Sequence, residues 1–451
     1  MNDRQAGAAG GQRNVAGRTL PEHVEQPIRR VAGILLTLSF LTTAWNAVFI
    51  GGFQPSDVLM LLAVLALILL RIRVPRPLRI PPGMLIGASL IGAAGLLSAI
   101  VPPSPLYLAL RYAPPDVASG ALVARANLPQ LGKFEIALLM IPMAVALFYP
   151  SIRELKRFAN AWAISALCSA TIAITDALGI TNVNRGILGD IDTSGRQAGL
   201  SAQENHLAMA LVLVAPVVLS WVAHPAFRVR VFGLVGVVIT FFGMLETGSR
   251  AGFVVLLLCV AVASALTPKL RRMVPIALLA APLVLIVLLA DSGSLLTTIA
   301  TESRLASGLG TQSDIGRSLL QQQALLDIQS SPLFGIGFDH LTDAHEVHLQ
   351  LLAAGGILTL AGYAIYWLTA ARTGIRARKV ETDLAPLLLT SVLSFVVLNF
   401  FENQVSDRYL YVPCALLVGI RLCLGARSDA ARKSALEQPG DVPKRRRQVS
   451  I

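Results

Sequence analysis

Three histidines lie within nine residues at the start of an apolar segment: His340, His345 and His348. An imidazole changes its charge near neutral pH, so it can accept a proton from a substrate hydroxyl. A histidine at the edge of an apolar run stays in contact with water. The segment therefore predicts acid–base chemistry at the surface of a membrane.

Arg250 lies in Thr247-Gly-Ser-Arg250, which joins two apolar runs almost without a loop. A guanidinium at that depth is costly unless it finds an anion or reaches water. One interpretation is an ion pair with Glu246, four residues away. The other is an anion site shared with Arg196 and Arg317, because three guanidinium forks match the oxygens of a diphosphate. Spacing alone leaves both open.

Other polar groups are weaker candidates. Asp190 and Asp192 resemble the acidic pair with which many sugar transferases hold a metal, but two aspartates in a loop are common. His206 is expected at the start of a helix, His224 in a loop on the cytoplasmic side, and His340 in a loop. No glycine loop for phosphate, serine nucleophile elbow or HExxH pair is present. We expect neither a metal nor a cofactor.

The elements that position these residues are apolar helices. Hydrophobic residues make up 54% of the chain, charged residues 14%, and the mean hydropathy is +0.65. Apolar runs of this kind predict membrane-spanning helices, because lipid leaves the backbone no other hydrogen-bond partner. We predict an all-α polytopic bundle of twelve spans, at residues 31–50, 56–70, 83–101, 132–149, 159–179, 205–223, 231–247, 251–268, 273–290, 347–370, 384–401 and 409–425. The second span is short and could be tilted or partly re-entrant.

The distribution of Lys and Arg predicts the orientation. One set of alternating loops holds sixteen of them in short connections, and the other holds nine in longer ones. The positive-inside rule places the first set and both termini in the cytoplasm. The histidine segment and the three arginines then face the periplasm of a bacterial inner membrane.

The chain divides into a basic tail at 1–30, a transmembrane domain at 31–425 and a second basic tail at 426–451. The tails contribute to the net charge of +12 and suit anionic lipid better than nucleic acid. A large periplasmic loop, 291–346, separates spans nine and ten and should contain short helices. Residues 316–328 predict one, with Leu320, Ala324 and Ile328 on one stripe and Ser313 as its cap.

The ordered motifs resemble the O-antigen ligase and polymerase family of bacterial membrane glycosyltransferases. The resemblance rests on Arg196-Gln-Ala-Gly199 leading to Asn205, Thr247-Gly-Ser-Arg250, Gly316-Arg317, Ser331-Pro-Leu-Phe-Gly335-Ile-Gly337, Ala344-His345, Leu349-Gln-Leu-Leu352 and Gly355-Gly-Ile-Leu358. It covers roughly residues 180–370. Glu346 stands where the family usually has a small polar residue, and Ala354 where it often has an acidic one.

The resemblance implies an inverting, metal-independent transfer of a glycan from undecaprenyl diphosphate to a sugar hydroxyl of lipid A–core. With this chemistry, our hypothesis assigns Arg250 and Arg317 to the diphosphate, Arg196 to a supporting contact and His345 to the acceptor hydroxyl. Glu346 or His348 would orient His345. A polymerase that joins lipid-linked repeat units of O-antigen or exopolysaccharide is the main alternative, and the family also contains enzymes that glycosylate proteins. A transporter or flippase is less favoured, because the spans carry few charges.

Overall fold

The computed structural model describes residues 22–49, 53–73, 78–101, 107, 129–183, 195–271, 312–338 and 344–437. Every secondary-structure element in these ranges is a helix, so the predicted all-α class is confirmed for the described part of the chain. Asp190, Asp192 and His340 lie outside the described residues. Most of the predicted tails and much of the loop 291–346 also lie outside them, so the proposed domain boundaries stay predictions.

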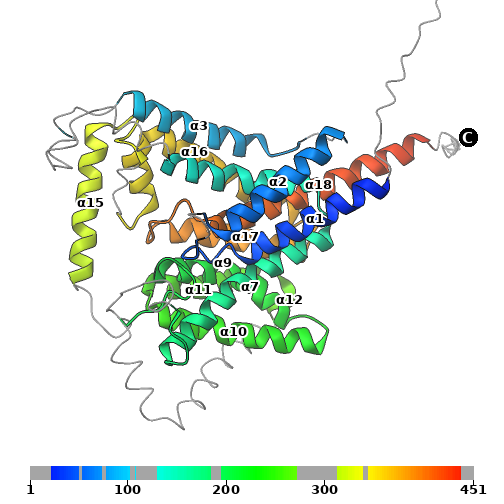
Figure 1. The fold of residues 1–451 in the computed structure, drawn as a ribbon, viewed down its shortest axis with the longest axis horizontal. Coiled ribbons are helices and arrows are strands. Elements are labelled where there is room, and N and C mark those ends of the chain that lie inside the picture. The colour runs from blue at the N-terminus through cyan, green and yellow to red at the C-terminus, as the bar shows by residue number, and fades with distance from the viewer. Residues whose placement is uncertain are drawn as a thin grey trace, which may run out of the picture.

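Figure 1 shows the helices in one bundle. The first half of the chain forms α1 (Glu22–Leu41), α2 (Pro55–Arg73), α3 (Pro82–Ile100), η1 (Ile136–Met140), α6 (Ile141–Phe148) and α7 (Ile152–Ala177). The second half forms α9 (Glu204–Val222), α10 (Phe227–Thr247), α11 (Arg250–Leu266), α12 (Pro268–Arg271), α15 (Gln312–Ser330), α16 (Val347–Ala377), α17 (Leu384–Leu398) and α18 (Arg408–Glu437).

Eight helices in the described ranges are long and apolar enough to cross a membrane, and α11 and α17 are shorter apolar helices. This finding supports a polytopic membrane protein. The predicted span 273–290 lies outside the described residues, so the count of twelve stays a prediction. The predicted second span is longer than expected: α2 has 19 residues, or about 28 Å at 1.5 Å per residue, which matches the hydrocarbon core of a bilayer.

The first predicted span, 31–50, is shifted in the structure. The helix α1 begins at Glu22 and ends at Leu41, and it is not among the eight candidate spans. Its first half is polar, and Arg29 there pairs with Glu154 of α7 at 3.0 Å. The prediction was wrong at both ends because the helix continues through polar residues that hydropathy does not count.

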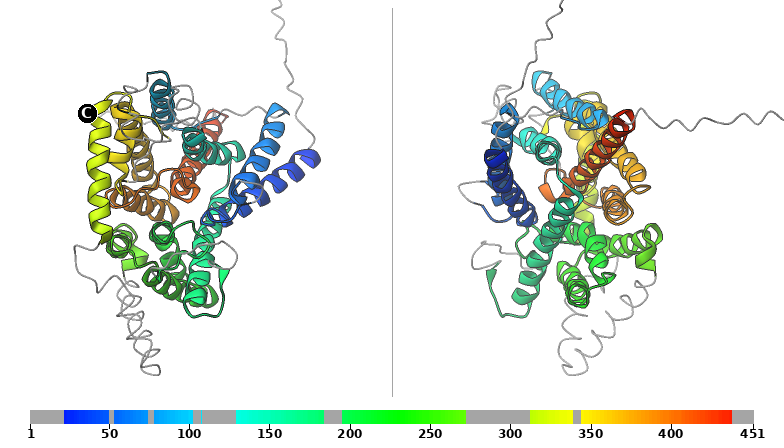
Figure 2. Two further views of the ribbon diagram at one scale, coloured as in Figure 1. Left: turned by 60° about the vertical axis from the view of Figure 1, so that its left-hand side comes forward. Right: turned by 90° about the vertical axis from the view of Figure 1, so that its right-hand side faces the viewer.

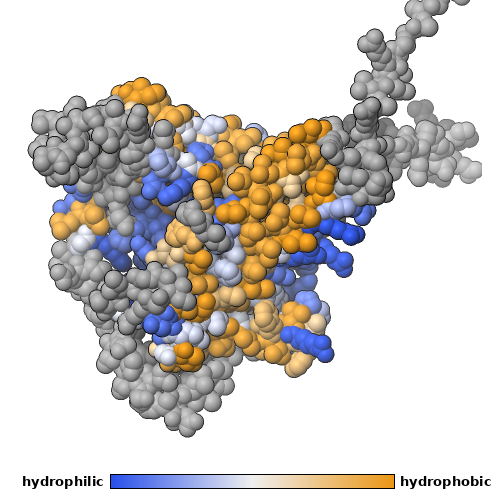
Figure 3. All heavy atoms as spheres, viewed as in Figure 1, coloured by the Kyte–Doolittle hydropathy of each residue, from blue (hydrophilic) through white to orange (hydrophobic). Residues whose placement is uncertain are grey.

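The helix α9 is the centre of the bundle. It is buried along almost its whole length and packs against α7, α10, α11 and α17. The outer surface over α2 is also apolar. Figure 3 shows hydrophobic residues gathered there, and Leu61, Leu65 and Leu69 of α2 are exposed. Exposed leucines on one helix face are expected where lipid, rather than water, is the solvent.

The helix α15 lies along the edge of the bundle, beside α16 (Figure 2, yellow-green and gold). Its Ala324 is fully buried and forms a small cluster with Ala344 and Ala353, against which Ile328 packs. The predicted inward stripe is thus confirmed for Ala324 and Ile328. The predicted cap is wrong, because α15 begins at Gln312 and Ser313 lies inside it.

The segment 331–338 docks into a kink of α16. Gly356 adopts φ 65° and ψ −165°, which interrupts the helix. The break frees backbone groups that bond with the segment: Ile336 N–H donates to Ala353 O at 2.8 Å and Gly337 N–H donates to Ala354 O at 2.9 Å. A Cβ on Gly335 or Gly356 would overlap the facing backbone, so this close approach requires glycine at both positions.

Candidate functional site

The turn between α10 and α11 places Arg250 at a helix N-terminus. Gly248 has φ 59° and ends α10 in the left-handed conformation. Ser249 then caps α11 by accepting a hydrogen bond from Gly252 N–H at 3.1 Å. Arg250 is therefore the first residue of α11. A helix N-terminus carries partial positive charge and free N–H groups, which add to the guanidinium in attracting an anion.

Arg196 ties this turn to the start of α9. Its Nε donates to Thr247 O at 2.6 Å, and its Nη2 donates to Asn205 Oδ1 at 2.7 Å. Its Nη1 lies 3.5 Å from Glu204 Oε2, with both side chains largely buried. Gly248 leaves room for this guanidinium, since a Cβ there would come within 3.3 Å of Arg196 Nε. The arginine holds two helix ends together.

All three predicted arginines line one small cavity of about 40 Å³. Arg250 comes from the α10–α11 turn, Arg317 from α15 and Arg196 from the segment before α9. The volume is close to that of one water molecule, about 30 Å³, and far below the ~300 Å³ of a typical ligand pocket. A diphosphate can enter only if a lining side chain moves.

Glu402 also lines this cavity, and sequence reasoning missed it. The residue is 1% exposed and follows Phe401 in the turn after α17. A buried carboxylate beside three guanidinium groups balances part of their charge, which would otherwise be costly to bury. The sequence carried one signal for it, an acidic residue directly after an apolar span.

Arg317 differs from Arg196 in its bonding. Its Nε is buried and has no hydrogen-bond partner among the described residues. Arg317 also lies near the N-terminal end of α15, where an anion is favoured. Buried N–H groups are normally paired. The unpaired N–H of Arg317 is therefore available to donate to an oxygen of a ligand.

His345 precedes α16 in the left-handed conformation, with φ 49°. Histidine is one of the few residues other than glycine that adopts this region, and such residues gather at functional sites. Its neighbour Ala344 is fully buried against α15. Glu346 stands directly before the first residue of α16 and makes no capping hydrogen bond with its side chain.

The start of α16 is bonded to the turn that carries Glu402. Val347 N–H donates to Asn399 O at 2.9 Å, and the His348 ring lies 4.6 Å from the Phe400 ring. His345, Glu346 and His348 do not line the arginine cavity themselves. The contacts of Val347 and His348 with Asn399 and Phe400 place the start of α16 close to Phe401 and Glu402, which line the cavity, because two residues of chain span at most about 7 Å.

A buried polar network lies next to the site. The Asn46 amide is 2.9 Å from His206 Nδ1 and donates to Asp407 Oδ2 at 2.7 Å. Arg408 donates two hydrogen bonds of 2.7 Å to the carboxylate of Asp57. His206, expected only as a residue at a helix start, is thus part of a network that joins the beginnings of α2, α9 and α18.

Asp407 is ionised within this network. Burial alone would raise the pKa of its carboxyl. The charge and hydrogen bond of His206, the charge of Arg408 and the hydrogen bond from Asn46 outweigh burial and hold the pKa below its usual value of 3.8. The network fixes the loop 402–407, which carries Glu402 into the arginine cavity.

One segment of the chain is similar to a known family. Residues 235–364 match the family model described as O-antigen ligase. This segment is therefore similar to the O-antigen ligase and polymerase family, and the match supports the resemblance seen in the motifs. The match contains Arg250, Arg317 and His345, whereas Arg196 and Glu402 lie outside it. A comparison with curated proteins gives no match. No group of three or more His, Cys, Asp or Glu side chains in the described ranges is arranged to hold a metal ion.

Proposed function

We propose that this membrane glycosyltransferase moves a glycan from undecaprenyl diphosphate to a sugar hydroxyl of lipid A–core, on the periplasmic side of the bacterial inner membrane. The observation that supports it most directly is the cavity shared by Arg196, Arg250 and Arg317. The family match supports the general class of ligase and polymerase.

The arginines suit the departure of a diphosphate. In the proposed transfer the acceptor oxygen attacks C1 of the donor sugar, and the C1–O bond to the diphosphate breaks with inversion. The electron pair of that bond goes to the diphosphate oxygen. Arg250 and Arg317 would stabilise this growing negative charge more in the transition state than in the ground state, which lowers the barrier. No metal is needed for that role.

His345 would take the proton of the acceptor hydroxyl. A general base of this kind typically contributes about 10²–10⁴-fold to the rate. Glu346 and His348 would bind the acceptor or orient the imidazole, His348 from its contact with Phe400. Arg196 would support the site without touching phosphate, because the turn and α9 already occupy its guanidinium.

The acceptor distinguishes the ligase from its main alternative, a polymerase of lipid-linked repeat units. The test is deletion of the gene, followed by gel analysis of lipopolysaccharide and of lipid-linked glycan. Loss of the ladder with long chains on the carrier supports the ligase. A core that bears a single repeat unit identifies an O-antigen polymerase instead. An unchanged ladder with loss of secreted polysaccharide identifies an exopolysaccharide polymerase.

The site assignment is tested by complementing that deletion with variants at equal protein abundance. His345→Ala and Arg317→Ala should abolish detectable transfer, whereas Arg376→Ala should complement fully, because Arg376 is an exposed residue in the last turn of α16. Wild-type transfer by either of the first two variants would exclude the assigned roles.

A further inference from the structure

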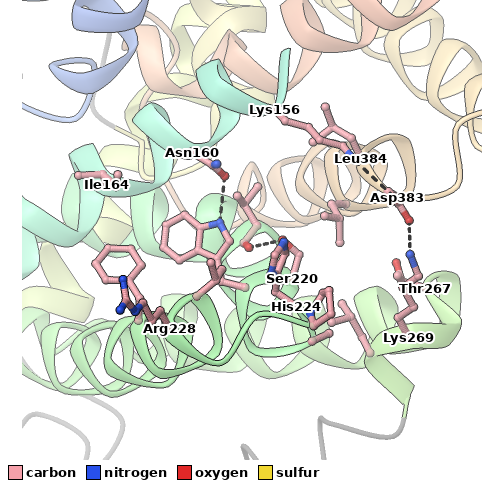
Figure 4. Close-up of a pocket in the computed structure, with 18 residues that line it drawn as sticks. Lys156, Asn160, Ile164, Ser220, His224, Arg228, Thr267, Lys269, Asp383 and Leu384 are labelled. Carbon is pink, nitrogen blue, oxygen red and sulfur yellow. Dashed lines mark hydrogen bonds and ion pairs between the residues drawn. The ribbon is translucent and has the colours of Figure 1, made fainter. Parts of the chain in front are cut away.

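A second cavity, of about 950 Å³, lies at the opposite end of the helices that carry the arginine site. It is bounded by α7, the α9–α10 turn, α12 and the start of α17 (Figure 4). The helices α9, α10, α11 and α17 run between the two cavities. The helix α9 has 19 residues and is about 28 Å long, close to the thickness of a bilayer core, and the two cavities lie near its opposite ends.

The lining combines an apolar wall with a basic rim. Apolar side chains of α9, α10 and α17 form the wall, including Trp221, Phe232 and Leu387. The wall continues outward along α10, where Phe232 and Val235 are exposed on the surface of the bundle. A ligand with a long apolar part can therefore lie partly in the cavity and partly along α10.

The rim carries more positive than negative charge. Lys156 lies 3.3 Å and Lys269 2.7 Å from the carboxylate of Asp383. The hydrogen bond from Lys269 is the largest cause that lowers the pKa of Asp383, so this carboxyl is ionised and balances one lysine. Arg228 is exposed and adds a further positive charge. The described lining thus has a net charge of +2 with His224 neutral.

Thr267 supplies an independent sign that a polar ligand belongs there. The side chain lines the cavity and is 5% exposed. Its Oγ1 is buried and has no hydrogen-bond partner in the described part of the chain. Buried hydroxyl groups are normally satisfied, so this one is suited to a ligand oxygen beside Lys269.

We propose that this cavity binds an anionic glycerophospholipid, such as phosphatidylglycerol, from the leaflet opposite the glycan transfer site. The phosphodiester contacts Arg228 and Lys269 at the rim, and an acyl chain follows the apolar wall toward Phe232. Basic pockets between membrane helices recognise anionic headgroups in this way. The cavity is separate from the arginine site, so its lipid is not the glycan donor.

The experiment is native mass spectrometry of the purified full-length protein with phosphatidylglycerol or phosphatidylethanolamine of identical acyl chains. Phosphatidylglycerol should bind in preference. Arg228→Gln with Lys269→Gln should lower its affinity by about fivefold for each charge removed. Lys156 stays in place to pair with Asp383, which protects the fold. Arg376→Gln with Lys379→Gln removes the same charge from exposed positions outside the cavity and should change nothing.

Two further arms distinguish a lipid held in the cavity from a general attraction of charge and from a site for free phosphate. Ala223→Trp places an indole ring in the cavity without changing its charge and should also reduce phosphatidylglycerol binding. Inorganic phosphate should bind much more weakly than the lipid. Equal binding of the two lipids, equal losses in the two double variants, retained binding in Ala223→Trp, or phosphate binding as tight as the lipid would each overturn the proposal.

Discussion

Replacement of Arg196 by lysine should destabilise the protein by about 2–4 kcal/mol, although the charge is kept. The guanidinium donates to Thr247 O and Asn205 Oδ1 and lies against Glu204. A single ammonium nitrogen cannot reach all three groups. Each lost hydrogen bond to a charged group costs about 1.5–3 kcal/mol, and a buried acceptor left without a donor costs about 1–3 kcal/mol.

The same substitution at Arg317 should act differently. Arg317 Nε has no hydrogen-bond partner among the described residues, so lysine there should leave the free energy of unfolding nearly unchanged. The loss should appear in the transfer reaction, where lysine cannot bind phosphate through two parallel N–H groups. A loss of about 1.5–3 kcal/mol corresponds to roughly a 10–150-fold lower kcat/KM.

The assay compares both variants with Arg376→Lys as a surface control. Thermal unfolding in detergent measures stability, and transfer from a purified lipid-linked donor measures kcat and KM. We expect a lower Tm for Arg196→Lys and a wild-type Tm with slower transfer for Arg317→Lys. An unchanged Tm for Arg196→Lys would refute the supporting role, and an equal drop in Tm for both would refute the distinction between them.

Three other predictions concern the same region. Gly356→Ala should destabilise the fold by at least about 1–2 kcal/mol, because its φ of 65° is left-handed and a Cβ would overlap the docked segment. Gly316→Ala is the control: a Cβ there meets open space, so this variant should not lower the Tm. Glu402→Gln removes the buried carboxylate that competes with the donor diphosphate for the three arginines, so the KM for the donor should fall. A higher KM in steady-state kinetics would contradict this charge-balancing role of Glu402. The pKa of Asp407 is lowered in the folded protein. Its stabilising contribution is therefore present above the unfolded pKa of about 3.9 and is lost as the pH falls through the lower folded pKa. Asp407→Asn should unfold at a lower temperature than wild type at pH 7, and this difference in Tm should shrink below pH 4.

Hydropathy and charge predicted the parts of the structure that depend on local sequence. Apolar runs located most of the described helices, but they missed the polar ends of α1, α7, α16 and α18, where each helix continues beyond the apolar residues that hydropathy recognises. Arg250 and Arg317 stood out because a guanidinium is rare on the outer side of a membrane bundle. That reasoning needed no knowledge of the fold, and the structure brings both residues into one cavity.

The features that sequence reasoning missed depend on contacts between distant residues. Asn46 and Asp407 are 361 residues apart, and no periodicity relates them. The kink at Gly356 exists because residues 331–338 dock there, so a helical pattern through Gly355-Gly-Ile-Leu358 gives no sign of it. Glu402 reaches the arginines only because the loop after α17 turns back into the bundle.

The arginine cavity cannot be complete within the segment that matches the family. Arg250 and Arg317 lie inside residues 235–364, but the cavity also needs Arg196 and Asn205 before that segment and Glu402 after it. Arg196 bonds to the α10–α11 turn, and the loop after α17 bonds to the start of α16. The segment before α9 and the loop after α17 therefore hold the α10–α11 turn and the start of α16 in position through hydrogen bonds from outside residues 235–364. Substitutions in these two flanking segments should therefore change the shape of the cavity even where Arg250, Arg317 and His345 are kept.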